Sequence, residues 1–340
     1  MTTGNMEIGS EFWNAPVGPG RNALFPADAQ WYASGRSALK AILRDIGSAH
    51  SAALPSWCCD SIVKPFLDAG MEVRFYPVRR TSEGLVQEID TQCDVLFVMD
   101  FFGFSPASAT AFSHPCVIRD ATHSLFSFHH SDAPYIFGSL RKWCGVYGAG
   151  FAWADHPLPM ADAEDLGYAE CRQKAMVLKA RYLRDKASGL PCDAEKVRYL
   201  DLFGKAEEML DALDALPAHP HDIFIAQNLD VDTLARRRRA NARILMDAFP
   251  DLLLFPELGP SDVPLAVPIL VPDGRRDALR QYLIRQEIYL PVHWPRTPLQ
   301  NTAPDPSGFY RDELSLVCDQ RYTAADMDRM VRAIRGFLKG

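Results

Sequence analysis

Short apolar segments alternate with segments of helical periodicity through the first half of the chain, and this alternation constrains the fold more than any other feature. Several of the short segments are apolar at almost every position, which is typical of strands covered on both faces of a parallel sheet. Strands of this kind separated by helices predict an α/β fold. The expected strands are residues 51–55, 72–78, 94–100, 116–120, 135–137 and 150–154, and the expected helices are residues 36–46 and 58–69.

After residue 116 the order of the segments differs from that of a simple doubly wound domain. The strands between residues 116 and 154 follow one another without long helices, and residues 161–216 are helix-forming, with an interruption at Pro191. The proline-rich residues 217–221 predict a joint between domains. Beyond this joint we expect helices at residues 230–249, at 277–286 and from Thr323, where Asp326 completes a capping-box pattern, and strands at 252–255, 264–271, 288–292 and 313–318.

Composition limits the classes of function. The 340 residues include 36 Lys and Arg and 43 Asp and Glu, and the net charge of −7 disfavours a nucleic-acid-binding protein. The basic run at residues 236–239 lies in an expected helix, which favours a solvated or interface face over a nucleic-acid patch. The sequence contains no run of about 18 apolar residues, which a membrane-spanning helix would need, and no visible secretion signal. A cytoplasmic protein is therefore expected. The eight cysteines lack a C-x-x-C pair, which favours reduced thiols and no metal site.

The first of four short motifs is Ser-Gly-Arg-Ser-Ala-Leu at residues 34–39. Its residues Gly35, Arg36 and Ser37 lie where a helix is expected to begin, and the unpaired N–H groups of a helix N-terminus bind phosphate. A plain helix cap explains the same residues and is the favoured interpretation of this motif taken alone.

The second motif is Arg-Asp-Ala-Thr-His-Ser at residues 119–124. Asp120 ends a short apolar strand, where α/β sheets bind their ligands. Its carboxylate would accept a charge-assisted hydrogen bond from a cationic ring N–H. A simple turn residue is an equally supported interpretation.

The third motif, Ser-Leu-Arg-Lys at residues 139–142, follows a strand-like segment. Its apolar neighbours Phe137 and Trp143 would partly desolvate Lys142, which lowers the pKa of an ammonium group and frees the amine for Schiff-base chemistry. A solvated lysine is the favoured alternative for this motif alone.

The fourth motif, residues 55–59, offers Trp57 for stacking on a planar ring, although a core tryptophan is the favoured alternative there.

Together the four motifs supply a phosphate cradle, a ring stack, a carboxylate for a ring nitrogen and a lysine for a Schiff base, which a pyridoxal phosphate site requires. In this order they resemble the fold-type I pyridoxal-phosphate enzymes, and within them the DegT/DnrJ-type sugar aminotransferases. The resemblance runs from about Glu11 to the C-terminus. It includes the segments LPSWCCDSIVKPFLDAGMEVRFYPV, MDFFGFSP, GSLRKWCGVYGAGFAWA and LSLVCDQRYTAADMDRM.

This resemblance implies a role for each candidate residue. Lys142 would hold pyridoxal 5'-phosphate as a Schiff base and move the proton at the α-carbon of the substrate. Asp120 would keep the pyridine nitrogen protonated, and His123 would approach the phenolic oxygen of the cofactor. The phosphate would be bound by Gly35, Arg36, Ser37 and Ser139, the ring would stack on Trp57 or Cys59, and the substrate would face Arg141, His293 and Trp294.

The same resemblance implies an architecture and partners. A large domain at residues 1–225 would carry an N-terminal arm, a mostly parallel mixed sheet and a helical section, and residues 226–340 would form a smaller α/β domain. A homodimer is implied, with glutamate or glutamine as amino donor and a keto-sugar or similar keto metabolite as acceptor. Neither a nucleic acid nor a membrane is expected as a partner.

Two features differ from the common members of the family. Arg141 stands directly before the lysine. No Gly-x-Asn-x-Arg segment follows the lysine, and Asn228 is at best a weak match to the asparagine of that segment. These differences leave open another pyridoxal-phosphate reaction, such as elimination, racemisation or decarboxylation, or a cofactor-bound regulatory protein without turnover. A nicotinamide-dependent enzyme is disfavoured, because residues 148–150 lack the continuation of a G-x-G-x-x-G motif into a helix.

Overall fold

The computed structural model describes residues 7–89, 92–105, 114–126, 132–163, 165–190 and 192–339. These residues divide into two compact units, each assembled from separate stretches of the sequence. The first unit comprises residues 11–45 and 137–231, and the second comprises residues 7–10, 46–136 and 232–340. Residues 46–136, which the predicted domain at residues 1–225 includes, group with residues 232–340 in the second unit. The division into domains at residues 1–225 and 226–340 stays a prediction.

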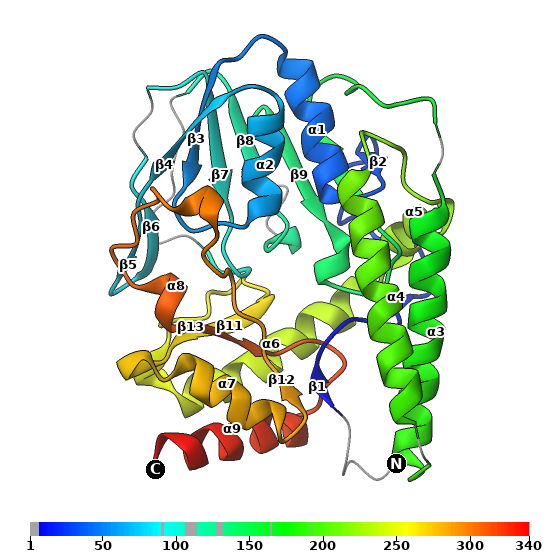
Figure 1. The fold of residues 1–340 in the computed structure, drawn as a ribbon, viewed down its shortest axis with the longest axis vertical. Coiled ribbons are helices and arrows are strands. Elements are labelled where there is room, and N and C mark those ends of the chain that lie inside the picture. Colours follow the sequence, from blue (N-terminus) through cyan, green and yellow to red (C-terminus); the bar gives the residue numbers. More distant parts are fainter. Residues whose placement is uncertain are drawn as a thin grey trace. The chain divides into compact units, whose positions relative to one another are not determined.

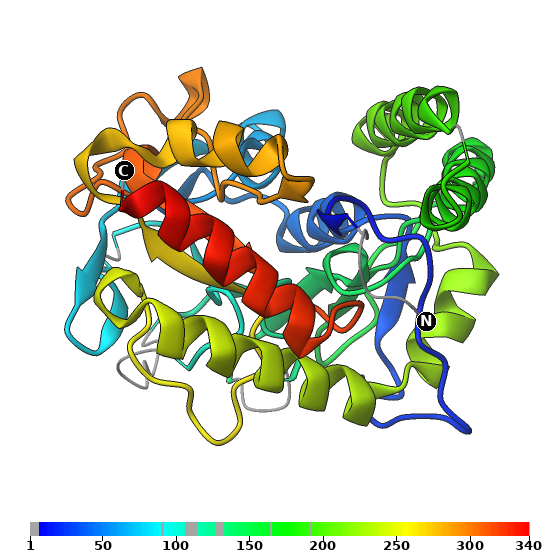
Figure 2. The ribbon, with the colours of Figure 1, turned by 90° about the horizontal axis from the view of Figure 1, so that it is seen from below.

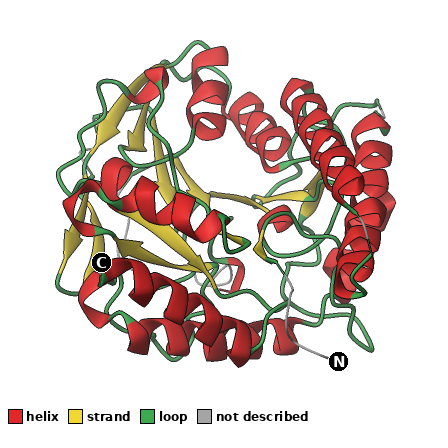
Figure 3. Cartoon of the chain, turned by 60° about the horizontal axis from the view of Figure 1, so that its bottom comes forward, coloured by secondary structure: helices red, strands yellow, loops and turns green. Residues whose placement is uncertain are grey.

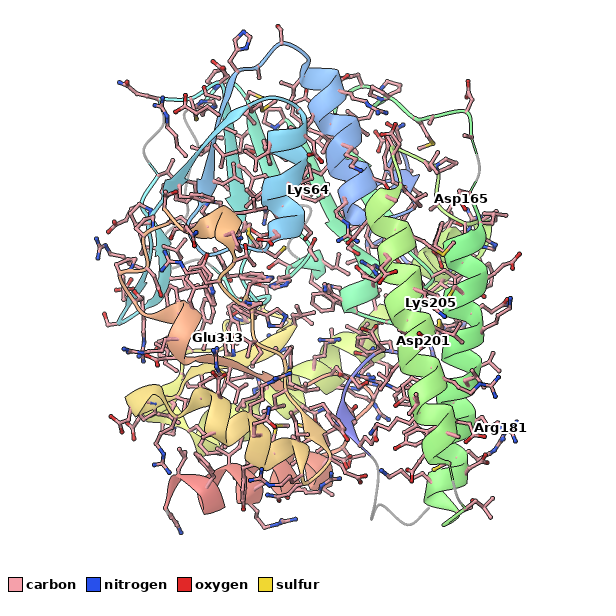
Figure 4. All side chains as sticks on the ribbon, in the orientation of Figure 1. Lys64, Asp165, Arg181, Asp201, Lys205 and Glu313 are labelled. Carbon is pink, nitrogen blue, oxygen red and sulfur yellow. The ribbon has the colours of Figure 1, made fainter. Side chains whose placement is uncertain are left out.

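A long helical pair carries much of the apolar core of the first unit. Helices α3 (Gly167–Ala187) and α4 (Asp193–Ala212) run side by side (Figures 1 and 3). The predicted interruption of the helical section falls between them, although Pro191 itself lies outside the described residues. On its exposed side α4 carries an ion pair of 2.8 Å between Asp201 and Lys205 (Figure 4). The buried core of this pair includes Tyr168, Tyr182, Tyr199, Phe203 and Leu210.

The first unit also contains helix α1 (Gly35–Ile46). Strand β2 (Gln30–Tyr32) precedes this helix and pairs antiparallel with β10 (Gly150–Trp153). Helix α5 (Pro220–Asn228) begins with a proline in its first turn, where the missing N–H costs no hydrogen bond. The segment predicted as a joint therefore contains the start of a helix.

Four parallel strands form the centre of the second unit. Strand β3 (Ser51–Pro55) pairs with β4 (Glu72–Tyr76) on one side and with β7 (Val95–Met99) on the other, and β8 (Val117–Asp120) pairs with β7. Every residue of β7 is buried, as its apolar sequence predicts for a central parallel strand. Helix α2 (Asp60–Asp68) joins β3 to β4.

A seven-stranded sheet contains these four strands, the β2–β10 pair and β9 (Tyr135–Ser139). The strands are hydrogen-bonded in the order β2-β10-β9-β8-β7-β3-β4. The three pairings among β4, β3, β7 and β8 are parallel, whereas β2 and β10 are antiparallel. The predicted α/β fold with a mostly parallel mixed sheet is therefore confirmed.

The C-terminal part of the second unit packs helices around a two-stranded antiparallel sheet (Figure 2). Its last helix begins at Thr323 with both hydrogen bonds of the predicted capping box, to and from Asp326. The two strands are β11 (Ala266–Leu270) and β13 (Glu313–Val317). The helices are α6 (Val231–Ala248), α7 (Arg276–Ile284) and α9 (Ala324–Leu338). The short elements are helix α8 (Phe309–Asp312) and the parallel pair of strands β1 (Ile8–Gly9) and β12 (Ile288–Tyr289).

Some predicted elements differ from the structure. Residues 252–255 form no strand, because a 3₁₀ turn (Pro250–Leu252) and one isolated bridge from Leu253 replace it. The strand expected at residues 288–292 shortens to β12. The hairpin of β5 (Val78–Thr81) and β6 (Gly84–Gln87) was not predicted. Within the described ranges, no helix is both long and apolar enough to cross a bilayer.

Candidate functional site

In the first unit, helix α1 begins with a tightly capped turn. The backbone N–H of Ser37 donates to Oγ of Ser34 over 3.1 Å, and both serines are buried. The first turn carries no acidic residue. Because the first N–H groups of a helix lack intrahelical partners and lie at the positive end of its dipole, this turn is suited to an anion.

The loop after Lys142 packs directly against the chain that leads into α1. A Cβ atom added to Gly150 would lie 2.0 Å from the carbonyl oxygen of Ser34, and one added to Gly148 would lie 1.9 Å from that of Ala33. No side chain fits at either glycine. The structure therefore brings the first and third motifs together within one unit, as their predicted common site requires.

Ser139 lies beside the start of α1, at the last position of β9. A Cβ on Gly35 would lie 3.3 Å from the Cβ of Ser139. The Ser139 hydroxyl is buried and has no hydrogen-bond partner among the described residues. A buried hydroxyl without a partner is costly, so this group is suited to a ligand that accepts its hydrogen bond. Ser139 and the start of α1 at Gly35 therefore fit a phosphate group, whereas the Arg36 guanidinium is paired with Glu207 and Asp211. Phosphate binding by these residues stays a prediction.

Three arginines of the first unit surround Glu207 of α4. Arg36 Nη2 and Arg141 Nη2 each lie 3.0 Å from Glu207 Oε1, and Arg172 Nη1 lies 3.9 Å from Oε2. Burial alone would raise the pKa of the Glu207 carboxyl, but Arg141 and Arg36 hold this pKa well below its usual range. Sequence reasoning missed Glu207, because its partners lie in distant segments. The substrate role of Arg141 stays a prediction.

Lys142 itself ends the short turn η2 (Leu140–Lys142) that follows β9. Its side chain is exposed, whereas Phe137 and Trp143 are buried. The predicted desolvation of the lysine by these two residues is therefore wrong: both aromatic rings pack into the core instead of covering the amine.

Asp222 fixes the loop that follows the lysine. Its carboxylate accepts hydrogen bonds from the backbone N–H groups of Tyr147, over 2.8 Å, and Gly148, over 2.7 Å. The side chain is fully buried. Sequence reasoning missed this residue too, since nothing in the segment around Asp222 indicates which distant N–H groups it meets.

We expect replacement of Asp222 by Ala to lower the free energy of unfolding by about 3 kcal/mol, because two buried N–H groups lose their acceptor at about 1–3 kcal/mol each. Asp165 is the matched control: it also accepts a backbone N–H, from Gly167 over 3.0 Å, but it is exposed, so water replaces it in Asp165→Ala (Figure 4). Urea unfolding of both variants measures the difference. Equal losses in the two variants would contradict the buried role of Asp222.

In the second unit, Asp120 ends β8 opposite Met99 of β7. The carboxylate is 3% exposed and accepts a hydrogen bond of 2.8 Å from the backbone N–H of Thr122. His123 is equally buried, and its Nδ1 lies 3.4 Å from the backbone nitrogen of Phe102. A buried carboxylate at the carboxyl end of a parallel strand matches the position predicted for a ligand-binding aspartate.

The structure brings His293 and Trp294 beside His123. The ring of Trp294 stacks on that of His123 at a centroid distance of 5.4 Å and an interplanar angle of 13°, and the His293 ring lies 5.4 Å from His123. The second motif and the predicted substrate segment, 170 positions apart, therefore share one aromatic cluster.

Trp57 belongs to the core of the second unit. It is 1% exposed and stacks on Phe309 at 4.3 Å and on Phe101 at 5.5 Å. The prediction that Trp57 stacks on a cofactor ring is therefore wrong, and the core alternative is the correct one. Cys59, which precedes α2 and is partly exposed, remains the predicted stacking position.

Three solved structures illustrate what the chain is similar to. A DegT/DnrJ/EryC1/StrS aminotransferase from Brucella abortus is 18% identical, with a TM-score of 0.56, over 91% of this chain and 85% of its own. Spr1654 from Streptococcus pneumoniae, in its PLP form, is 13% identical, with a TM-score of 0.62, over 94% and 91%. PseC from Helicobacter pylori, an aminotransferase of pseudoaminic acid biosynthesis, is 14% identical, with a TM-score of 0.61, over 96% and 99%.

No family model and no curated protein matches the sequence. Because the sequence identities to the three solved structures are only 13–18%, the likeness concerns the fold alone. It extends over most of the length of each chain. The chain has the α/β fold of these aminotransferase structures.

Proposed function

We propose that the chain is a pyridoxal-phosphate-dependent aminotransferase that moves an amino group from glutamate or glutamine to a keto-sugar or similar keto metabolite. The observation that carries the proposal is the arrangement in the first unit. A buried Ser139 hydroxyl, for which the described part of the chain offers no hydrogen-bond partner, lies beside the capped start of α1, and Lys142 follows three positions further along the chain. Likeness to aminotransferase structures, one of them in a PLP form, supports the same cofactor.

The residues of the first unit would bind the phosphate and supply the amine. The N–H groups at the start of α1 and the Ser139 hydroxyl would donate to the phosphate oxygens. Pyridoxal phosphate, when bound, forms a Schiff base with an amine and withdraws electrons from the α-carbon of an amino acid. Lys142 would provide that amine and, once released by the incoming substrate, would carry the proton to and from the α-carbon.

The residues of the second unit would orient and polarise the ring and the substrate. Asp120 would accept the ring N–H in a charge-assisted hydrogen bond and so keep the ring nitrogen protonated. His123, held between Trp294 and the backbone of Phe102, would approach the phenolic oxygen. His293 and Trp294 would face the substrate. We infer a homodimer from the same resemblance, and light scattering at the elution peak of the purified protein measures its mass.

Ser139 gives a direct test of the phosphate cradle. We expect Ser139→Ala to weaken the binding of pyridoxal phosphate about tenfold, because one hydrogen bond to a charged group contributes about 1.5 kcal/mol. Its hydroxyl has no partner within the described chain, so thermal stability without cofactor should not fall. Titration of both proteins with the cofactor, beside the exposed control Ser188→Ala, measures the effect. Unchanged affinity would contradict the cradle.

The reaction itself is tested by a half-reaction. Glutamate or glutamine alone should convert the cofactor-loaded protein to its pyridoxamine form, followed by the change in its visible spectrum, because an aminotransferase keeps the amino group after the first product leaves. No conversion with any amino donor would contradict transamination. Release of ammonia, or uptake of solvent deuterium at the α-carbon without amine transfer, would instead support the other pyridoxal-phosphate reactions.

A further inference from the structure

Two buried N–H donors of the first unit have no role in the function proposed above. The Nε atoms of Arg36 and Arg141 are buried, and neither finds a hydrogen-bond partner among the described residues. The Ser139 hydroxyl shares both properties. A buried donor without an acceptor costs free energy, and more so when it belongs to a charged group. These three donors together therefore indicate a ligand that accepts their hydrogen bonds.

The backbone brings the three donors to one place. A Cβ on Gly35 would lie 3.3 Å from the Cβ of Ser139. Arg36 directly follows Gly35, and Arg141 follows Ser139 by two positions. Both arginine side chains also reach the same atom, because Nη2 of each lies 3.0 Å from Oε1 of Glu207. The two guanidinium groups therefore leave the backbone beside the predicted phosphate cradle and meet at one carboxylate oxygen.

Carboxylates hold both guanidinium groups at their Nη atoms. Arg141 donates from Nη1 and Nη2 to the two oxygen atoms of Glu207. Arg36 uses its Nη2 for both Glu207 and Asp211. Because a guanidinium group is planar and rigid, fixing its Nη atoms also fixes the direction of its Nε–H. The carboxylates therefore orient both arginines without using either Nε–H group.

An anion with several oxygen atoms fits such donors. Arginine N–H groups match the oxygen atoms of a phosphate, and the first turn of α1 adds backbone N–H groups at the positive end of its dipole. The amine of Lys142 lies close to the same cluster. Burial raises the pKa of the Glu207 carboxyl, and the charge of Lys142 is among those that lower it. A ligand bound here therefore has its anionic group near the amine that would form the Schiff base.

We propose that Arg36 and Arg141 bind the phosphate group of the cofactor through their Nε–H groups, together with the Ser139 hydroxyl. This inference rests on the proposed function, and it assigns Arg141 to the phosphate instead of the substrate. Arg172 differs from these two arginines. Its Nη1 lies 3.9 Å from Oε2 of Glu207, but its Nε donates to the backbone carbonyl of Val146 over 3.2 Å, so it has no Nε–H left for a ligand.

Titration of the cofactor-free, full-length protein with two ligands tests the inference. Pyridoxal phosphate carries the phosphate group, whereas pyridoxal has the same aldehyde and ring without it. Arg141→Gln should weaken the binding of pyridoxal phosphate about 10- to 100-fold, the effect of one hydrogen bond to a charged group, and leave the binding of pyridoxal unchanged. Arg36→Gln should show the same pattern. Arg44→Gln is the matched control, because Arg44 lies on α1 too but is half exposed, and it should change neither affinity.

Several results would overturn the inference. Equal weakening of both ligands in Arg141→Gln would indicate a distorted site instead of a lost phosphate contact. Unchanged affinity for pyridoxal phosphate with a raised KM for the amino donor would return Arg141 to the substrate. If the glutamine variant does not fold, Arg141→Lys keeps a charge for Glu207 but has no Nε–H, and wild-type affinity for pyridoxal phosphate in that variant would also overturn the inference.

The inference and the proposed function can fail separately. A protein that keeps the phosphate-selective binding but shows no half-reaction with any amino donor would contradict the proposed function alone. A working half-reaction, with pyridoxal phosphate bound equally well by the wild-type protein and Arg141→Gln, would contradict the role of Arg141 alone. A wild-type protein that binds no pyridoxal phosphate would contradict both.

Discussion

Replacement of Lys142 by Ala should lower kcat by at least about 10⁴-fold. Under the proposed function the amine both holds the cofactor and moves the proton at the α-carbon, and proton transfer by a positioned side chain alone contributes about 10²–10⁴-fold. Loss of the covalent attachment adds to that effect. The lysine is exposed and follows β9 in a short turn, so its removal should leave the thermal unfolding midpoint almost unchanged. Turnover with a donor and acceptor pair measures the effect.

Lys64 on α2 is the matched control for this replacement, since it is an exposed lysine in the second unit (Figure 4). Lys64→Ala should keep the wild-type kcat. Lys142→Arg adds a second comparison, because it keeps the positive charge but forms no Schiff base. Activity of Lys142→Arg close to that of the wild-type protein would contradict covalent attachment and favour a role of charge alone.

The second large effect is expected at Asp120. Asp120→Asn should lower kcat by about 10- to 10²-fold, because a charge-assisted hydrogen bond to the ring nitrogen contributes about 1.5–3 kcal/mol and 1.36 kcal/mol corresponds to a factor of ten. An amide oxygen can still accept the N–H of Thr122, so the turn after β8 should remain intact. The bound cofactor should keep its attachment to Lys142 while turnover falls.

A cofactor analogue separates the electrostatic role of Asp120 from a purely structural one. Pyridoxal phosphate methylated on its ring nitrogen carries a permanent positive charge that needs no carboxylate. We expect this analogue to restore part of the lost kcat in Asp120→Asn and to give no gain in the wild-type protein. Equal kcat values for the two cofactors in the variant would contradict the role assigned to Asp120.

The sequence was sufficient to predict those elements whose formation depends on residues close to one another along the chain. The apolar run at residues 95–99, the helix that starts after Ser34 and the capping box of Thr323 and Asp326 all depend on neighbours within a few positions, and the structure confirms them. The order of motifs also anticipated that Gly35 and Ser139 lie beside each other, and their binding of phosphate stays a prediction.

The remainder depends on contacts between distant segments. The hydrogen-bonded residues Glu207 and Arg141 are 66 positions apart in the sequence, Asp222 and Tyr147 are 75 apart, and His293 and Ser315 are 22 apart. No local sequence pattern predicts such partners. Trp57 was misassigned as a stacking residue, because its burial depends on Phe309 from the far end of the chain. The exposure of Lys142 was missed for a related reason: whether an aromatic neighbour in sequence covers a side chain depends on where both residues point.

The most direct test of the account is reduction with borohydride after the purified protein is mixed with pyridoxal phosphate. The wild-type protein should show a yellow absorbance band that borohydride bleaches, and mass spectrometry of its peptides should find the reduced cofactor on Lys142. Lys142→Ala should lack both the band and the adduct. A protein that takes up no cofactor, or that carries the adduct on a different lysine, would contradict the assignment of Lys142 and the function proposed from it.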